Sequence, residues 1–431
     1  MISLKNKLYD FKSFFKCGII NEIVVKILLL ILRCTMYNKK MYDLGSNPSA
    51  IRDLFEYGKR RKQEIGNEFV FDFSLGNPSV PAPSIVNETL TDLITNTDPS
   101  ILHGYTSAVG DVKVRKSIAE YLNKTYKSNF SSDLIYLTVG AAASLTISLN
   151  AIVNEGDEVV VIAPFFPEYK VFVEKAGATL VTVASDEKTF LPDVEKIKCN
   201  INQNTKAIII NYPNNPTGVM IDHETLQALC VMLNECEKKY QHPIYLISDE
   251  PYRELLYNNI EYLFITNYYK NSIVCYSFSK SLSLPGERIG YILVNPLCEN
   301  AKEVYFAVCG AGRSLGFVCA PALFQYMIPN CLGYTSDLSV YELNRNLLYD
   351  NLTKIGYEVV KPDGAFYLFV KALEGDALSF CERAKKYELL IVPSNSFGCN
   401  GYVRISYCVD TEMIKRSLSS FKAIYDSNKE V

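Results

Sequence analysis

Three apolar runs between residues 207 and 276 constrain the fold of this chain more than any other feature. They occupy 207–210, 244–247 and 273–276, and isoleucine recurs in all of them. Short, continuous apolar runs with β-branched residues predict strands that are buried on both faces, as in a parallel sheet. The segment 224–240 between two of the runs has a helical pattern. We therefore predict an α/β fold with a mixed, mostly parallel sheet that carries helices on both faces.

A polar cluster follows each of these runs. Asn-Tyr-Pro-Asn-Asn-Pro-Thr-Gly begins at Asn211, Ser-Asp-Glu-Pro-Tyr begins at Ser248, and Ser-Phe-Ser-Lys begins at Ser277. In open α/β sheets, ligands bind at the carboxyl ends of the strands. The spacing of the clusters therefore predicts that all three line one binding site.

The third cluster contains a lysine in a setting suited to covalent chemistry. Lys280 comes three residues after Ser277 and eight residues before Arg288. A lysine amine whose pKa is lowered by burial or by nearby cations can form a Schiff base with an aldehyde. Hydroxyl and guanidinium groups such as those of Ser277 and Arg288 bind a phosphate dianion. The pattern suits a phosphorylated aldehyde cofactor, and the alternative is an ordinary solvated, serine-rich loop.

The order of the motifs resembles that of the class I/II aminotransferases, in the aspartate aminotransferase superfamily of fold type I. The motifs are Asn-Asn-Pro-Thr-Gly, Asp-Glu-Pro-Tyr, Ser-Phe-Ser-Lys and Arg-Ile-Gly-Tyr, and the resemblance covers roughly residues 37–425. It implies pyridoxal 5′-phosphate as cofactor and a small-molecule amino acid and 2-oxo acid as partners. It further implies a homodimer with shared active sites, whose large cofactor domain is joined to a smaller α+β domain.

The resemblance assigns a role to each residue around the reacting part of the cofactor. Lys280 matches the Schiff-base lysine that also moves the proton, and Asp249 matches the carboxylate paired with the pyridine nitrogen. A carboxylate there keeps that nitrogen protonated, which makes the ring a better electron acceptor. Tyr252 and Asn215 match the two groups that hydrogen-bond the phenolic oxygen. The alternative for Asp249 is a helix N-cap after a strand.

Other matched positions concern the phosphate and the faces of the ring. The segment 137–144 predicts a strand that passes through a glycine into a helix, whose free N–H groups can bind a phosphate. By resemblance, the N–H groups of Ala141 and Ala142 do so, although an ordinary strand-to-helix turn is the alternative. Phe166 matches the aromatic residue that stacks on the ring, with a core position as its alternative. Tyr105 would reach the phosphate of the cofactor in the partner subunit.

The resemblance also implies the substrate-binding residues. Arg404 stands in an apolar, strand-like segment and matches the arginine that pairs its planar fork with the substrate α-carboxylate. Gly76 would let the backbone approach that carboxylate, and Asn215 is expected beside it. Arg313 lies 33 residues after Lys280, near the side-chain-binding arginine of dicarboxylate-specific members. It suggests a preference for aspartate or glutamate, and the alternative is a role in binding phosphate or solvent.

We predict four segments from these matches. Residues 1–36 form an extension outside the catalytic fold, 37–81 an N-terminal arm with part of the small domain, 82–335 the large domain that binds pyridoxal 5′-phosphate, and 336–431 the rest of the small domain.

Residues 23–32 form a strongly apolar run within the extension. The run lacks a following signal-cleavage site and is shorter than the roughly 20 residues that span a bilayer. We interpret the extension as a misassigned start upstream of Met36 rather than a membrane anchor.

Composition narrows the compartment and the partners. A net charge of −3 with scattered lysines gives no signature of nucleic-acid binding. Thirteen cysteines without regular spacing indicate reduced thiols and a cytoplasmic location. With three histidines and no Cys-x-x-Cys pair, a metal site is not expected.

Together these observations predict an amino-acid aminotransferase that works by ping-pong transfer, with 2-oxoglutarate as the expected acceptor. Two alternatives stay open. A β-lyase or synthase of the same superfamily would use the same Lys280 and Asp249. A non-catalytic regulatory module on this fold would not need the intact Lys280.

Overall fold

The computed structural model describes residues 37–46 and 50–429. The chain divides into two compact units between Asp53 and Leu54. The described part of the first unit contains α3 (Lys39–Ser46) and the beginning of α4 (Ala50–Ile65). The predicted extension, residues 1–36, lies outside the described residues. No helix in the described ranges is long and apolar enough to cross a membrane.

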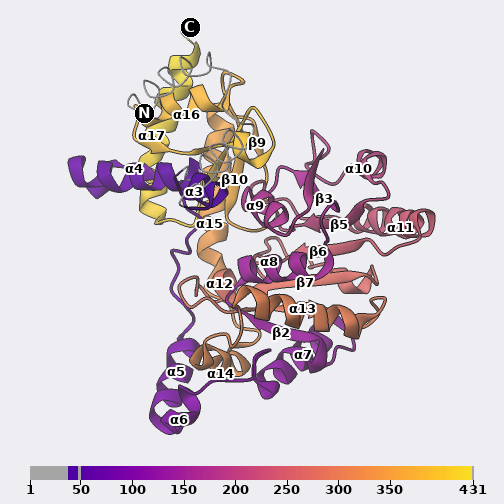
Figure 1. Ribbon diagram of the computed structural model, residues 1–431. Helices are drawn as coiled ribbons and strands as arrows, with labels where there is room; N and C mark the ends of the chain where they lie inside the picture. The colour runs from indigo at the N-terminus through magenta and orange to yellow at the C-terminus, as the bar shows by residue number, and fades with distance from the viewer. Residues whose placement is uncertain (1–36, 47–49, 430–431) are drawn as a thin grey trace, which may run out of the picture. The chain divides into compact units, whose positions relative to one another are not determined.

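A seven-stranded sheet organises the second unit (Figure 1). Its strand order is β2-β8-β7-β6-β5-β3-β4, and all neighbours are parallel except β8, which is antiparallel to β2 and β7. The strands are β2 (Ile135–Thr138), β3 (Glu158–Ala163), β4 (Thr179–Ala184), β5 (Thr205–Ile210), β6 (Tyr245–Asp249), β7 (Ser272–Ser277) and β8 (Gly290–Val294). The three predicted strands are thus β5, β6 and β7, and they are direct neighbours. The predicted mixed, mostly parallel fold is confirmed.

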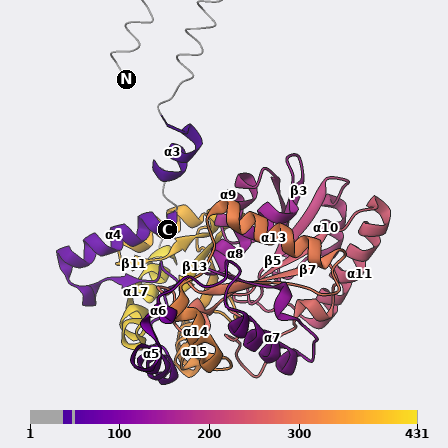
Figure 2. The ribbon, with the colours of Figure 1, turned by 60° about the horizontal axis from the view of Figure 1, so that its bottom comes forward.

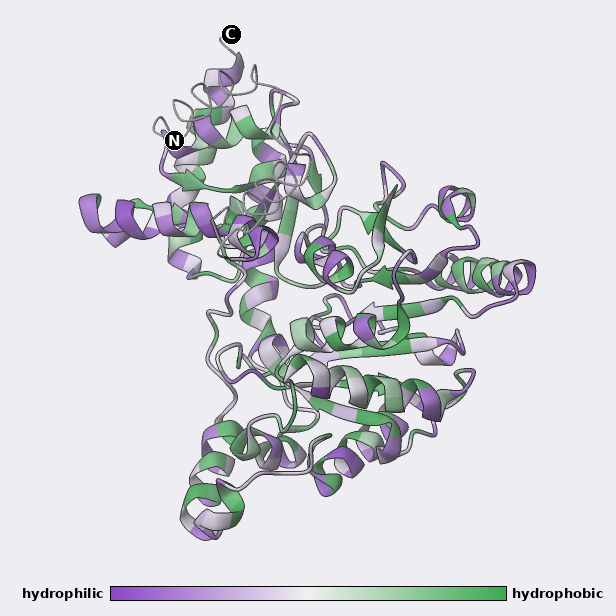
Figure 3. Cartoon of the chain, viewed as in Figure 1, coloured by the Kyte–Doolittle hydropathy of each residue, from purple (hydrophilic) through white to green (hydrophobic). Residues whose placement is uncertain are grey.

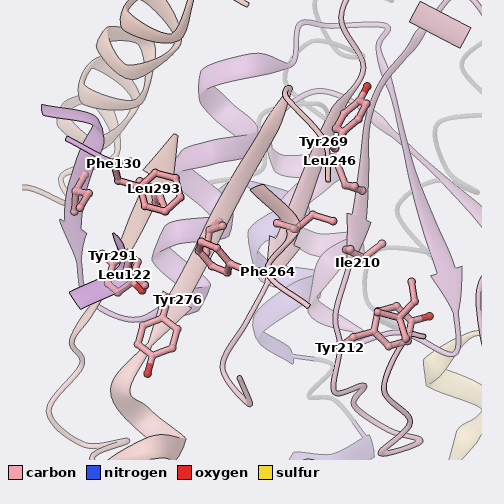
Figure 4. Close-up of a cluster of buried hydrophobic side chains, with 14 of the residues drawn as sticks. Leu122, Phe130, Ile210, Tyr212, Leu246, Phe264, Tyr269, Tyr276, Tyr291 and Leu293 are labelled. Atoms are coloured by element: carbon pink, nitrogen blue, oxygen red, sulfur yellow. The ribbon is translucent and has the colours of Figure 1, made fainter. Parts of the chain in front are cut away.

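The apolar runs form strands because they supply both faces of the sheet with core residues. Ile208 and Ile210 of β5 belong to one buried cluster, shown in Figure 4, whereas Ala207 and Ile209 belong to another on the opposite face. This alternation follows from the two-residue period of a strand. Figure 3 shows the hydrophobic colouring along the central strands.

Helices cover both faces, as Figure 2 shows for α13 on one side of β5 and β7 and for α7 on the other. Residues of α8, α9 and α13 contribute to one core, and residues of α7, α10, α11 and α14 to the other. The helices of the second unit after α4 are α5 (Ser84–Asn96), α6 (Pro99–Leu102), α7 (Val112–Tyr126), α8 (Ala141–Ile152), α9 (Glu168–Lys175), α10 (Val194–Asn200), α11 (His223–Tyr240), α12 (Phe278–Ser281), α13 (Ala301–Leu315), α14 (Ala322–Cys331), α15 (Leu338–Ile355), α16 (Ala377–Lys385) and α17 (Thr411–Lys429).

A second, smaller sheet has the order β12-β13-β10-β9 and is antiparallel throughout. Its strands are β9 (Val359–Val360), β10 (Tyr367–Lys371), β12 (Val392–Pro393) and β13 (Tyr402–Ser406). With α15, α16 and α17 it forms a separate hydrophobic core. The short strand β1 (Phe71–Asp72) pairs with β11 (Leu389–Leu390), so a segment from before the large sheet joins this C-terminal region. The predicted domain boundaries at 81 and 335 stay predictions.

Candidate active site

The carboxyl ends of β5, β6 and β7 bring the three polar clusters together. Asp249 is the last residue of β6, and Ser277 ends β7 and caps the short helix α12, which contains Lys280. The side-chain amide of Asn211 donates a hydrogen bond to the carbonyl oxygen of Asp249 over 2.8 Å. The backbone N–H of Asn215 donates to the side-chain oxygen of Asn211 over 2.8 Å. The predicted gathering of the clusters at adjoining strand ends is confirmed.

Asp249 is a buried carboxylate with one oxygen left free. Its Oδ2 accepts a 2.6 Å hydrogen bond from the hydroxyl of Tyr169, and its Oδ1 is buried without a partner among the described residues. Burial raises the pKa of Asp249 to about 7, against the lowering effect of the Tyr169 hydrogen bond. A turn rather than a helix follows β6, so the helix-cap alternative is wrong. Tyr169 had no role predicted from the sequence.

The amine of Lys280 lies beside the backbone at Gly76 and the ring of Phe366. Its Nζ donates to the carbonyl oxygen of Gly76 over 2.7 Å and lies 5.4 Å from the ring centre of Phe366. Burial lowers the pKa of Lys280 to about 8, and the positive charges of Arg288 and Arg404 act in the same direction. The flanking residues Ser277, Ser279 and Ser281 are all buried, so the solvated-loop alternative is wrong for this segment.

The beginning of α8 and the side chain of Arg288 form a cradle suited to an anion. Helix α8 starts at Ala141, and Gly140 before it has a φ of 92°, which glycine adopts readily. A Cβ atom at Gly140 would lie 2.8 Å from Nη2 of Arg288. The guanidinium therefore lies against the helix N-terminus, where the first N–H groups, including those of Ala141 and Ala142, have no partner within the helix.

Arg404 is buried on β13 with its guanidinium held by neutral oxygens. Nη1 donates to the side-chain oxygen of Asn215 over 3.1 Å, and Nη2 donates to the carbonyl oxygen of Ser74 over 2.7 Å. Its Nε is buried without a partner in the described part of the chain. A buried arginine without a carboxylate partner is costly. This arrangement is suited to the arrival of an anionic ligand.

A second tyrosine, Tyr367, accompanies Tyr252 in the site. Their hydroxyl oxygens are 2.9 Å apart, and both side chains are buried. The ring centre of Tyr367 lies 4.6 Å from Cζ of Arg404. A Cβ atom at Gly76 would overlap the Tyr367 hydroxyl, which explains why a glycine stands there. Tyr367 was not predicted as a site residue, because it occurs in an apolar strand and resembles a core residue.

The remaining predicted residues differ in how far their side chains are exposed. Phe166 is half-buried just before α9, with its ring centre 5.7 Å from that of Tyr169, whereas the neighbouring Phe165 is a core residue. Tyr105 is 99% exposed, so in this chain alone it does not enter the site. Arg313 is exposed in the last turn of α13, and its guanidinium has no hydrogen-bond or ion-pair partner among residues 37–46 and 50–429.

A buried ion pair fixes the loop after β6. Nε of Arg253 donates to Glu250 over 2.6 Å, and Nη1 donates to the hydroxyl of Tyr291 over 2.8 Å. The guanidinium carbon lies 4.3 Å from the ring centre of Tyr276 and 5.0 Å from that of Phe264, two rings labelled in Figure 4. Because Glu250 directly follows Asp249 and Arg253 directly follows Tyr252, this pair holds the loop in place.

These groups fit pyridoxal 5′-phosphate. The buried, unpartnered oxygen of Asp249 suits a protonated ring nitrogen, and the lowered pKa of Lys280 suits reaction with an aldehyde. The cradle at Gly140 and Arg288 suits the phosphate.

Comparisons with known proteins agree with this geometry. The family model "Aminotransferase class I and II" matches residues 69–421. The aspartate aminotransferase of Thermotoga maritima is 30% identical over 366 residues, which cover 84% of this chain and 92% of that protein. A crystal structure of an amino transferase from Eubacterium rectale is 55% identical, with a TM-score of 0.89, and the match covers 91% of this chain and 98% of that one.

The aspartate aminotransferase of Thermus thermophilus, solved with maleate, is 26% identical with a TM-score of 0.78, over 88% of this chain and 97% of that one. The chain therefore belongs to the class I and II aminotransferases, and it is a pyridoxal 5′-phosphate-dependent enzyme that transfers amino groups between amino acids and 2-oxo acids.

Proposed function

We propose that Lys280 is the residue that binds the cofactor aldehyde and moves the substrate α-proton. The observation that carries this assignment is the position of its amine, which contacts the Gly76 carbonyl and has a pKa lowered to about 8 by burial. An amine with this pKa is unprotonated for part of the time near neutral pH, so it can accept a proton at Nζ and return it. When bound, pyridoxal 5′-phosphate supplies the aldehyde and an electron-accepting ring.

Asp249 is the residue that keeps the ring nitrogen protonated, through the Oδ1 atom that has no partner in the described chain. Tyr169 holds the other carboxylate oxygen and so fixes the orientation of the group. Tyr252 and Asn215 are the proposed donors to the phenolic oxygen. Phe166 covers one face of the ring, since it is the partly exposed aromatic side chain beside Tyr169.

The phosphate is bound by the N–H groups of Ala141 and Ala142, the hydroxyl of Ser277 and the guanidinium of Arg288. The contact of Arg288 with Gly140 supports this assignment, because it brings a cation to a helix N-terminus. Tyr105 completes the group from the partner subunit. Its nearly complete exposure in the single chain supports a homodimer with shared active sites, which sedimentation velocity can test directly.

Arg404 binds the α-carboxylate of every substrate. Its guanidinium is already oriented by Asn215 and Ser74, so little conformational entropy is lost when the carboxylate arrives. The backbone at Gly76 approaches the same carboxylate. Since Asn215 contacts Arg404 as well, it links the substrate to the cofactor.

The preferred amino donors are aspartate and glutamate, and 2-oxoglutarate is the acceptor. Two observations support this choice: the similarity to aspartate aminotransferases, one of them solved with the dicarboxylate maleate, and the exposed, unpartnered Arg313. Because its guanidinium has no partner within the described residues, Arg313 is available to the side-chain carboxylate of a substrate bound in a neighbouring subunit. A cytoplasmic location fits the eleven cysteines of the described ranges, all of which are free thiols.

A panel of amino donors tests the substrate assignment. With 2-oxoglutarate as acceptor, Arg313→Ala should lower kcat/KM for aspartate and glutamate about tenfold or more relative to alanine and phenylalanine, because a charge-assisted hydrogen bond is lost. Arg416→Ala, which removes another exposed arginine, is the matched control and should leave the panel unchanged. An equal loss for acidic and neutral donors would place Arg313 in a phosphate-binding or structural role. Product release without an acceptor would favour the lyase alternative.

A further inference from the structure

Tyr367 contacts three parts of the active site at once. It is the first residue of β10 and lies opposite Ser406 of β13, two positions from Arg404 on the same face of the sheet. Its ring centre is 4.6 Å from the guanidinium carbon of Arg404, and its hydroxyl is 2.9 Å from that of Tyr252. The hydroxyl also lies against Gly76, where a side chain would overlap it.

The hydroxyl of Tyr367 decides where the proton of Tyr252 can point. Each tyrosine hydroxyl carries one proton, so Tyr252 cannot donate to Tyr367 and to the cofactor at the same time. Within the described residues, the two hydroxyls have only each other as hydrogen-bond partners. When Tyr252 donates to the phenolic oxygen, it must therefore accept from Tyr367.

The ring of Tyr367 acts on the other end of the site. Nη1 and Nη2 of Arg404 donate to neutral oxygens, and no carboxylate from residues 37–46 or 50–429 pairs with its charge. An aromatic face near a desolvated guanidinium stabilises it electrostatically. The ring thus supports Arg404 in a buried position before the substrate binds.

We propose that Tyr367 is a positioning residue that couples the two ends of the site: its hydroxyl directs the proton of Tyr252 toward the cofactor, and its ring holds Arg404 for the substrate carboxylate. This inference rests on the roles proposed above for Tyr252 and Arg404.

Two substitutions separate the hydroxyl from the ring. Tyr367→Phe keeps the ring, so binding of maleate and KM for the preferred donor should stay within about twofold. The pH midpoint of the visible absorption band of the loaded enzyme should rise by roughly half a unit. The midpoint rises because Tyr252, which no longer accepts a hydrogen bond from Tyr367, donates more weakly to the phenolic oxygen. That oxygen then holds the proton that it shares with Nζ of Lys280 more tightly.

Tyr367→Leu removes the ring as well. In addition to the shift of the midpoint, it should weaken maleate binding, measured as a change in the visible spectrum, and raise KM roughly 3- to 30-fold. Tyr407→Phe is the matched control. Tyr407 is a buried tyrosine whose hydroxyl donates to the carbonyl oxygen of Ala365 and not to Tyr252, so loss of this hydroxyl should change stability without moving either measurement.

The reference variant Tyr252→Phe distinguishes the possible failures. If Tyr252→Phe shifts the midpoint and Tyr367→Phe does not, the coupling is wrong and the proposed function stands. If Tyr252→Phe itself has no effect, the role of Tyr252 is wrong.

The double variant Tyr252→Phe/Tyr367→Phe should shift the midpoint no further than Tyr252→Phe alone, and additive shifts would also overturn the coupling. Should Tyr367→Leu fail to fold, Tyr367→Phe and this cycle still decide the hydroxyl role.

Discussion

Replacing Asp249 with asparagine should stabilise the cofactor-free protein while it disables the enzyme. The carboxyl is buried, with Tyr169 on one oxygen and no partner on the other among the described residues. Ionising such a group inside the protein is costly unless a positive charge is present. Without the cofactor, the described part of the chain supplies no cation that contacts this group. Asparagine has nearly the same shape, can still accept from Tyr169, and removes the ionisation.

The size of the effect follows from the pKa of Asp249, which burial raises from 3.8 to about 7. Each unit corresponds to about 1.4 kcal/mol, so the ionised carboxylate destabilises the folded state by at most ~4 kcal/mol. Between these two pKa values the folded state binds more protons than the unfolded state, and the free energy of unfolding therefore falls as the pH rises from about 4 to about 7. Above that pH range, the decrease in the free energy of unfolding reaches its full size.

Urea unfolding of the cofactor-free protein at a series of pH values measures this contribution. Asp249→Asn should be a few kcal/mol more stable than the native chain at pH 8, and the difference should disappear near pH 4. Asp350→Asn, at an exposed carboxyl, is the control and should leave the free energy of unfolding unchanged at every pH. A stability difference that is absent, or equally large at both pH values, would refute the reasoning. In the loaded enzyme the same variant should lower turnover by about 100-fold or more, because it removes the charge that we propose keeps the ring nitrogen protonated.

Three further substitutions address other parts of the site. Lys280→Ala should abolish turnover and the visible absorption band, and peptide mapping after borohydride reduction of the native enzyme should find the cofactor on Lys280; another labelled lysine would contradict the assignment. Gly140→Ala should weaken cofactor binding about tenfold or more, because the residue has a positive φ and its Cβ would displace Arg288; an unchanged Kd would contradict the cradle. Arg404→Lys should raise KM for every donor and acceptor, since a point charge replaces a bidentate fork; an effect on one substrate alone would exclude a common carboxylate site.

The strand core and the strand-end residues were predictable because their signals are local. The runs at 207–210, 244–247 and 273–276 are continuously apolar, so both faces of each strand must be buried, as in a parallel sheet. The structure shows them as neighbouring parallel strands. The polar residues that follow then lie at one edge of the sheet. The antiparallel placement of β8 had no such signal, because an apolar run does not indicate the direction of its partner.

Tyr169 and Tyr367 could not be predicted in the same way. Their contacts with Asp249 and Tyr252 join positions 80 and 115 residues apart, and no local pattern determines which loops face each other. The chain has 30 tyrosines, many of them in apolar surroundings, so composition does not distinguish a site hydroxyl from a core ring. The roles that we propose for Tyr105 and Arg313 involve a second subunit, whose position the sequence of one chain does not predict.

The ion pair between Glu250 and Arg253 has a consequence for how the enzyme responds to dissolved salt. Ions in solution screen exposed charges over about 10 Å at 0.1 M ionic strength, and they act much less on a pair enclosed by aromatic rings. The loop that carries Asp249 should therefore keep its geometry from dilute buffer to concentrated salt. Arg288 is exposed, so chloride or sulfate can compete there with a phosphate. Ionic strength should thus weaken cofactor binding at its phosphate end and leave the ring-nitrogen end unaffected.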